Sequence, residues 1–158
     1  MSLIFRMIYA VITSLFKPRL HPDALKSSVP MWVLPNDLDI NIHMNNGRYL
    51  TICDLASIDI FLRTGIGKLM FSREWMPVIS ESTMKYKRPL KLFQKYYVNI
   101  EVVSWDKKSF GLKYTFTVKG HIVAEGTSKA CIISKAGVIN TQKVYQEMLS
   151  NWPDKEVA

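Results

Sequence analysis

The feature that most limits the fold is a helix expected over residues 47–64, whose apolar side chains cover most of the helical circumference. The apolar positions are Tyr49, Leu50, Ile52, Cys53, Leu55, Ala56, Ile58, Ile60, Phe61 and Leu62. Asn45 or Asn46 can cap the start of this helix, and Gly65 can end it. A helix that is apolar on most sides must be buried on several sides, so the rest of the chain has to surround it.

After Trp75 the apolar residues change to a two-residue period, which predicts β-strands. The expected strands are residues 29–34, 78–90, 97–105, 112–118 and 122–134, and a closing helix is expected over 141–152 with Thr141 as its cap. The last four strands follow one another through short turns, which indicates antiparallel pairing. We therefore expect an α+β fold of the hotdog type, an antiparallel sheet wrapped around a long central helix. A helix lying flat on an open sheet is the alternative.

The first residues form a separate apolar segment. Residues 3–16 are almost wholly apolar, and on a helix their few polar positions share one narrow stripe with Lys17. About 14 residues are short for a membrane-spanning helix, which needs about 20, and residues 16–19 do not resemble a signal-peptide cleavage site. Two interpretations remain open: a helix lying on a membrane surface, or a helix that packs on its own domain or on a partner subunit.

Charge and cysteine content limit the partners and the compartment. A net charge of +8 suits nucleic acid, an anionic membrane or a phosphorylated small molecule such as coenzyme A. The longest basic run is only residues 85–91, so nucleic acid is not expected. Cys53 and Cys131 lack the spacing of a disulfide framework or a zinc site, which favours a reducing compartment such as the cytoplasm, with possible membrane association. Cys53 is expected to be a core residue.

Polar groups are concentrated in residues 36–49, between two apolar elements. If residues 39–43 are extended, Asp39, Asn41 and His43 point to one side, while Ile40 and Ile42 point to the other and anchor the segment in the core. The helix that follows would direct unpaired backbone N–H groups toward this cluster.

These groups suit the transfer of an acyl group to water. A helix N-terminus can polarise a carbonyl oxygen, Asp39 or His43 can act as general base, and Asn41 can orient the water or the imidazole. One histidine with one aspartate is a poor zinc set, so no metal or other cofactor is expected. The alternative is that these are ordinary loop residues, with Asn45 and Asn46 forming a turn and a helix cap.

Residues 37–49 closely resemble the D-L-D-x-N-x-H-x-N-N-x-x-Y signature of plant acyl-ACP thioesterases. They are also similar to the 4-hydroxybenzoyl-CoA thioesterase-like hotdog proteins and to animal thioesterase superfamily members, which carry an apolar N-terminal leader. The resemblance covers roughly residues 29–134. It implies an acyl-CoA or acyl-ACP thioesterase with Asp39, Asn41 and His43 as the catalytic set. The expected substrate-binding residues are Asn45, Asn46, Lys87 and Arg88.

The sequence pattern predicts a division of the chain, and the resemblance adds an expected assembly. Residues 1–27 would form the apolar helix and linker, and residues 28–158 the hotdog thioesterase-like domain. Related hotdog proteins pair two subunits into a continuous sheet, so we expect a homodimer or a dimer of dimers, formed through residues 78–90.

One departure from the plant signature keeps other functions open. Residues 85–90 carry no carboxylate where the plant enzymes have one. Asp54 or Asp59 of a partner subunit could supply it, although both also fit a plain polar stripe on the helix. The alternatives to hydrolysis are a non-catalytic acyl-binding or membrane-associated protein, and an enoyl-thioester hydratase.

Overall fold

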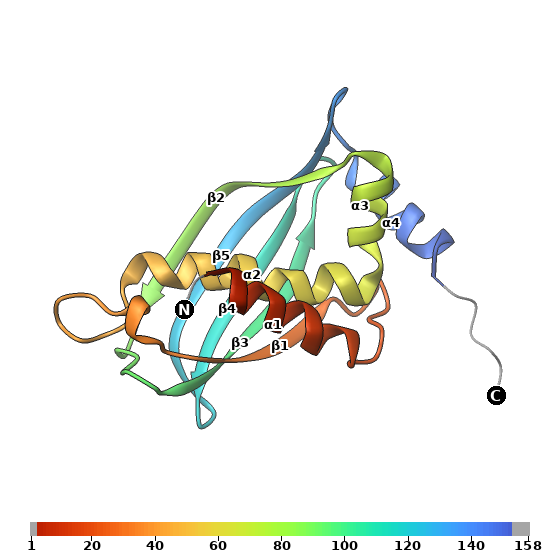
Figure 1. The fold of residues 1–158 in the computed structure, drawn as a ribbon. Coiled ribbons are helices and arrows are strands. Elements are labelled where there is room, and N and C mark those ends of the chain that lie inside the picture. Colours follow the sequence, from red (N-terminus) through yellow and green to blue (C-terminus); the bar gives the residue numbers. More distant parts are fainter. Residues whose placement is uncertain (1–2, 153–158) are drawn as a thin grey trace.

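The computed structural model describes residues 3–152 (Figure 1). The helices are α1 (Leu3–Leu15), α2 (Asn46–Thr64), α3 (Ile66–Arg73) and α4 (Thr141–Ser150), with a 3₁₀ turn, η1 (Pro35–Asp37), between β1 and α2. The strands are β1 (Lys26–Trp32), β2 (Met76–Tyr86), β3 (Lys95–Trp105), β4 (Phe110–Val118), β5 (His121–Ser134) and β6 (Gly137–Val138).

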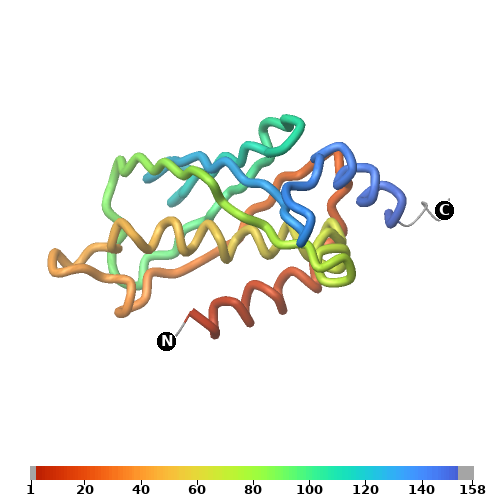
Figure 2. The backbone as a smooth tube through the Cα atoms, turned by 90° about the horizontal axis from the view of Figure 1, so that it is seen from above, coloured from red at the N-terminus to blue at the C-terminus, as the bar shows by residue number. Residues whose placement is uncertain are grey.

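The strands form one antiparallel sheet in the order β1-β3-β4-β5-β2, with the short β6 added to β5. The sheet curls around α2 (Figures 1 and 2), which confirms the predicted hotdog arrangement. The expectation that all four later strands pair in sequence order was wrong for β2, which pairs with β5 instead of β3. The connection between β2 and β3, residues 87–94, is long enough to carry the chain across the sheet, so β1 and β2 become the two edges.

The ends of α2 follow the predicted signals, whereas other boundaries differ. The Asn45 side chain caps α2 by accepting the Gly47 N–H, and Gly65 ends it in the left-handed conformation at φ 79°. Helix α3 was not predicted, because Gly65 was taken only as a stop. Helix α4 is capped by Asn140 and not by Thr141, whose hydroxyl donates to a backbone carbonyl instead.

Helix α2 supplies the centre of the core. Its fully or almost fully buried apolar side chains are Tyr49, Ile52, Cys53, Leu55, Ala56 and Ile60. Cys53 is 2% exposed, which confirms its expected place in the core, and burial raises the pKa of its thiol. Aromatic rings from the sheet complete the packing: Phe116 contacts both Tyr49 and Tyr96 at ring-centroid distances of 5.0 and 5.9 Å.

Helix α1 packs along α2, and α2 lies between α1 and most of the sheet (Figure 2). Its buried residues are Arg6, Ala10 and Ser14, so its narrow polar stripe faces the protein. Most of its apolar side chains remain exposed. None of the helices described in residues 3–152 is long and apolar enough to cross a membrane.

Asp59 of α2 holds the C-terminal end of α1. Its carboxylate is 1% exposed and accepts hydrogen bonds from Ser14 Oγ at 2.7 Å, Lys17 Nζ at 2.9 Å and Arg63 at 2.9 Å, as well as from Ser27 Oγ. Burial alone would raise the pKa of this carboxyl group, but the hydrogen bonds outweigh burial and hold the pKa below its ordinary value. The stabilisation is therefore present above the ordinary carboxyl pKa and is lost as the pH falls through the lower folded value.

At its other end α1 is held by Arg6, which pairs with the buried carboxylate of Asp37 and donates to the Trp32 carbonyl at 3.0 Å. Without α1 and the Lys17 that follows it, Asp37 would lose Arg6, and Asp59 would lose Ser14 and Lys17. We therefore propose that the part of the chain expected as residues 1–27 folds together with residues 28–158.

We predict that Asp59→Ala lowers the free energy of unfolding by about 3–5 kcal/mol, because it leaves the cations of a buried ion pair without their partner. Urea unfolding followed by circular dichroism measures this change. The control is Glu101→Ala, which removes the exposed pair with Lys26 and should cost less than about 1 kcal/mol. Equal, small losses in both variants would show that Asp59 does not hold α1 in place.

Candidate active site

The signature segment forms a tight turn between η1 and α2. The Asp39 N–H donates to the His43 carbonyl at 2.9 Å, the Ile42 N–H donates to the Asp39 carbonyl at 3.1 Å, and Leu38 forms a bridge with Met44. Ile42 has a φ of 59°, which is unfavourable for a β-branched residue. The expectation of an extended segment was therefore wrong.

This turn also changes the roles of the two isoleucines. Ile40 is 94% exposed and Ile42 is 67% exposed, so neither anchors the segment in the core as predicted. Met44, which is 3% exposed, performs that role. Its backbone N–H donates to the Leu90 carbonyl at 2.9 Å and fixes the turn to the segment that follows β2.

Asp39 is half-buried and closes the turn with its own side chain. Its Oδ1 accepts the Asn41 N–H at 2.8 Å and, at the longer distance of 3.4 Å, the His43 N–H. Its other oxygen, Oδ2, accepts no hydrogen bond from the residues described. One oxygen thus fixes the carboxylate, and the other can interact with a substrate or a water molecule.

Asn41 and His43, the other two members of the expected catalytic set, lie in the same turn as Asp39. The side chain of Asn41 is exposed and that of His43 is half-buried. Within residues 3–152, no hydrogen bond joins the side chains of Asp39, Asn41 and His43 to one another, and no three His, Cys, Asp or Glu side chains are grouped as metal ligands.

The N-terminus of α2 begins three residues after His43. Asn45 donates its N–H to the Asp37 carbonyl at 2.7 Å and accepts the Gly47 N–H at 2.8 Å on its side chain. The Gly47 N–H is therefore occupied and not unpaired as expected. Asn46, the first helical residue, accepts a hydrogen bond from the Tyr86 hydroxyl on its carbonyl at 3.0 Å, which joins the end of β2 to the start of α2.

Lys87 and Arg88 lie at the same end of the molecule as the turn. They follow directly after β2, and both of their N–H groups donate to the Val123 carbonyl. Both side chains are exposed, and Lys87 Nζ pairs with Glu125 at 2.9 Å. Three residues later, Lys91 forms a bridge with His43, so this basic segment and the turn lie side by side.

Asp37, the first residue of the signature, is a buried anchor and was not part of the expected catalytic set. It is 1% exposed, pairs with Arg6, and accepts the Leu34 N–H at 2.8 Å. Its Oδ1 accepts no hydrogen bond from residues 3–152 but lies 3.7 Å from Arg48 Nε. No sequence signal linked Arg6 to Asp37, because the two residues are 31 positions apart and are brought together only by the tertiary fold.

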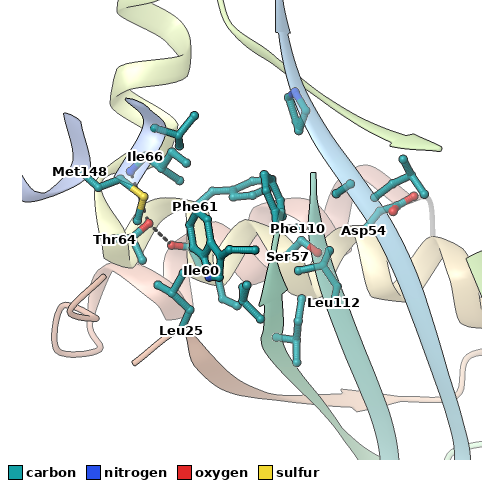
Figure 3. A pocket seen from close by; sticks show the side chains of 17 residues that line it. Leu25, Asp54, Ser57, Ile60, Phe61, Thr64, Ile66, Phe110, Leu112 and Met148 are labelled. Carbon is teal, nitrogen blue, oxygen red and sulfur yellow. Dashed lines mark hydrogen bonds between the residues drawn. The ribbon is translucent and has the colours of Figure 1, made fainter. Parts of the chain in front are cut away.

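A cavity of about 280 Å³ lies between α2 and the sheet (Figure 3). Its walls are mostly aliphatic and aromatic side chains, among them Leu25, Ile60, Phe61, Phe110, Leu112 and Met148. The side chains of Asp54, Ser57 and Thr64 are the polar exceptions. Figure 3 shows Asp54 at one side of the cavity, and Ile66 and Met148 at the opposite side.

The cavity follows one face of α2. Asp54, Ser57, Phe61 and Thr64 are spaced three or four residues apart and so lie on one side of the helix. Asp54 is about 12 Å along the axis from the helix start at Asn46, at 1.5 Å per residue. Burial raises the pKa of the Asp54 carboxyl group above its ordinary value. The sequence suggested Asp54 either as part of a polar stripe on the helix or as a carboxylate for a partner's site, whereas it borders the cavity of its own chain.

Several known proteins are similar to this chain. Protein THEM6 of Xenopus laevis is 33% identical over 138 residues, covering 84% of this chain and 65% of that protein. A probable thioesterase of Saccharomyces cerevisiae is 25% identical over 113 residues, covering 70% of this chain and 49% of that protein. The chain thus spans about half to two thirds of the length of these relatives.

Solved structures share the fold. The YbaW probable thioesterase of Escherichia coli superposes with a TM-score of 0.71 at 22% identity, over 77% of this chain and 95% of that one. A DHNA-CoA thioesterase of Staphylococcus aureus gives a TM-score of 0.68 at 15% identity, over 79% of this chain and 91% of that one. The family model of the thioesterase-like superfamily matches residues 33–151, which include the turn, α2 and the whole sheet except β1. The chain therefore belongs to the thioesterase-like superfamily.

Proposed function

We propose that the protein hydrolyses an acyl-CoA or acyl-ACP thioester to a free acid and a thiol. The observation that carries this proposal is the Asp39 carboxylate, held by one oxygen beside the start of α2 with its other oxygen available. Membership of the thioesterase-like superfamily and the apolar cavity along α2 support it. A gentisyl-coenzyme A thioesterase and a DHNA-CoA thioesterase are among the proteins with this fold.

In the proposed reaction Asp39 acts as general base. It takes a proton from a water molecule as the water oxygen attacks the thioester carbonyl carbon. The side-chain amides of Asn45 and Asn46, beside the start of α2, stabilise the negative charge on the carbonyl oxygen. The C–S bond then breaks, and the thiol leaves with the proton that Asp39 took from water. Asn41 and His43, in the same turn, orient the attacking water.

The ends of the substrate fit two different parts of the chain. The exposed cations Lys87 and Arg88 lie beside the turn and suit the phosphates of the carrier. The cavity, with few polar groups, suits the acyl group. Among the residues described, Asp54 is the only carboxylate that lines the cavity.

A non-catalytic acyl-binding protein is the second candidate. It is favoured by the missing hydrogen bond between the carboxylate of Asp39 and the imidazole of His43 among the described residues. Release of free thiol from acyl-CoA substrates of increasing chain length separates the two functions. Binding without thiol release would support the second candidate, and hydration of an enoyl-CoA without thiol release would indicate a hydratase.

We predict that Asp39→Asn lowers kcat at least ~100-fold, the low end for the loss of a general base. The asparagine Oδ1 can still accept the N–H groups of Asn41 and His43, so the turn and the folding stability should be retained. Thiol release and thermal unfolding are measured on the same preparation. Asp54→Asn is the comparison: if it abolishes turnover while Asp39→Asn does not, the reacting carboxylate is Asp54.

The cavity makes a separate prediction about the acyl group. Ala130 of β5 is 2% exposed and lines the cavity, so Ala130→Leu should shorten the preferred acyl chain by filling part of it. Rates of thiol release across a series of straight-chain acyl-CoA substrates measure this shift. Lys129→Leu adds a similar side chain at the neighbouring exposed position and should leave the profile unchanged. Identical profiles for both variants would mean that the acyl chain binds elsewhere.

The free edge of β2 makes a prediction about assembly. All but two of its residues are exposed, and the exposed ones include Met76, Ile79 and Tyr86. Because such an edge pairs readily with another strand, we predict a two-fold homodimer joined through β2, as expected from the sequence. Sedimentation velocity at low micromolar concentration should show a dimer for the wild type and a monomer for Ile79→Lys/Ser82→Lys. A fully active wild-type monomer would contradict this assembly.

A further inference from the structure

Helix α1 has an amphipathic pattern that is inverted relative to an ordinary surface helix. Its exposed side is formed by large apolar side chains and continues into Phe16, which is 86% exposed. The exposed residues are Leu3, Ile4, Phe5, Met7, Ile8, Ile12, Leu15 and Phe16. On a helical wheel the outer half of α1 contains no polar residue. A contiguous apolar surface of this kind marks an interaction site.

Buried ion pairs prevent α1 from turning this surface inward. Arg6 is bound to Asp37 near one end of the helix, while Ser14 and Lys17 are bound to Asp59 at the other. Rotation of α1 about its axis would expose or separate both sets of partners, and each involves a carboxylate that is 1% exposed. The outward direction of the apolar side is thus fixed by the fold.

A basic groove begins where the apolar side of α1 ends. It extends from Lys17 over β1, β3 and β4, and its charged lining residues are Lys17, Lys26, Arg63, Glu101 and Lys113. Lys17 and Arg63 pair with the buried Asp59, and Lys26 pairs with Glu101 at 2.7 Å, so the four cations still exceed the two carboxylates. The Lys26 side chain is 71% exposed. Arg19, also exposed, follows the helix. An apolar surface bordered by cations matches a layer of acyl chains beneath anionic headgroups.

The length of α1 and the charges beside it indicate what binds to its apolar side. The 13 residues of α1 span about 20 Å, less than the ~30 Å hydrocarbon layer of a bilayer, so α1 suits a position in the plane of the interface. A second copy on the same face would place one basic groove near the other, so that the cations of the two chains repel one another. An anionic lipid surface would attract these cations, and α1 can lie in its plane without having to span the bilayer.

We propose that the outer side of α1 binds the surface of an anionic lipid bilayer. The apolar side chains from Leu3 to Phe16 enter the boundary between headgroups and acyl chains, and the groove that contains Lys26 and Lys113 contacts the headgroups. The helix stays bound to α2 through Asp37 and Asp59, so the whole domain docks as one body. This surface is independent of the proposed hydrolysis, because the cavity lies on the sheet side of α2.

The test is co-sedimentation of the full chain with phosphatidylcholine vesicles, with and without phosphatidylglycerol. The wild type should bind the anionic vesicles, and Ile8→Glu/Ile12→Glu should weaken binding by at least about tenfold, since it places two charges in the centre of the apolar side. The control is Val138→Glu/Leu149→Glu, which adds the same charge at exposed apolar positions of β6 and α4 and should bind nearly as the wild type does. All variants are compared for thermal unfolding and for sedimentation without vesicles.

A second pair of changes tests the headgroup contact. Lys26→Glu/Lys113→Glu should weaken binding to anionic vesicles and reduce its dependence on salt, because it removes cations from the groove. Equal binding by the wild type and Ile8→Glu/Ile12→Glu would overturn the proposal, as would a wild type that binds no vesicles. A smaller oligomer for Ile8→Glu/Ile12→Glu in the absence of lipid would also overturn it, since a second copy would then cover α1.

Discussion

The buried carboxylate of Asp37 connects all the parts that form the candidate site. Its side chain pairs with Arg6 of α1, accepts the N–H of Leu34 after β1, and lies 3.7 Å from Arg48 Nε of α2. Its backbone carbonyl accepts the N–H of Asn45, the cap of α2. A charge that is 1% exposed is tolerated only with such partners. The positions of α1, the turn and the start of α2 are therefore set together.

Local sequence rules were sufficient for the elements that form by local contacts. The apolar circumference of residues 47–64 predicted a buried helix, and Asn45 and Gly65 predicted its ends, because capping depends on residues within one turn. The two-residue period predicted the strands from residue 97 onward. The position of β2 beside β5 depends on how the chain crosses the sheet after residue 86, and no local pattern encodes that path.

The candidate site was predicted in its membership but not in its shape. The alternation of polar and apolar residues over 39–43 indicates an extended segment, but it competes with the ability of an aspartate to bind the N–H two residues ahead. In the fold that second preference prevails, since Asp37 and Met44 are both buried and fix the ends of a short segment. Ile40 and Ile42 then have no route to the core.

Two different faces of helix α2 contact the cavity and helix α1. One face carries Asp54, Ser57 and Phe61 along the cavity, and another carries Asp59, which holds α1. Changes on α1's outer side therefore have no direct contact with the cavity, and the only shared residue near the turn is Asp37 with its partner Arg6. A substitution at Asp37 would disturb the turn and the position of α1 together, so its effect on turnover could not be assigned to chemistry. Among the residues described, Asp39 makes no hydrogen bond or ion pair with α1, so a substitution at Asp39 tests the chemistry with the least disturbance of α1.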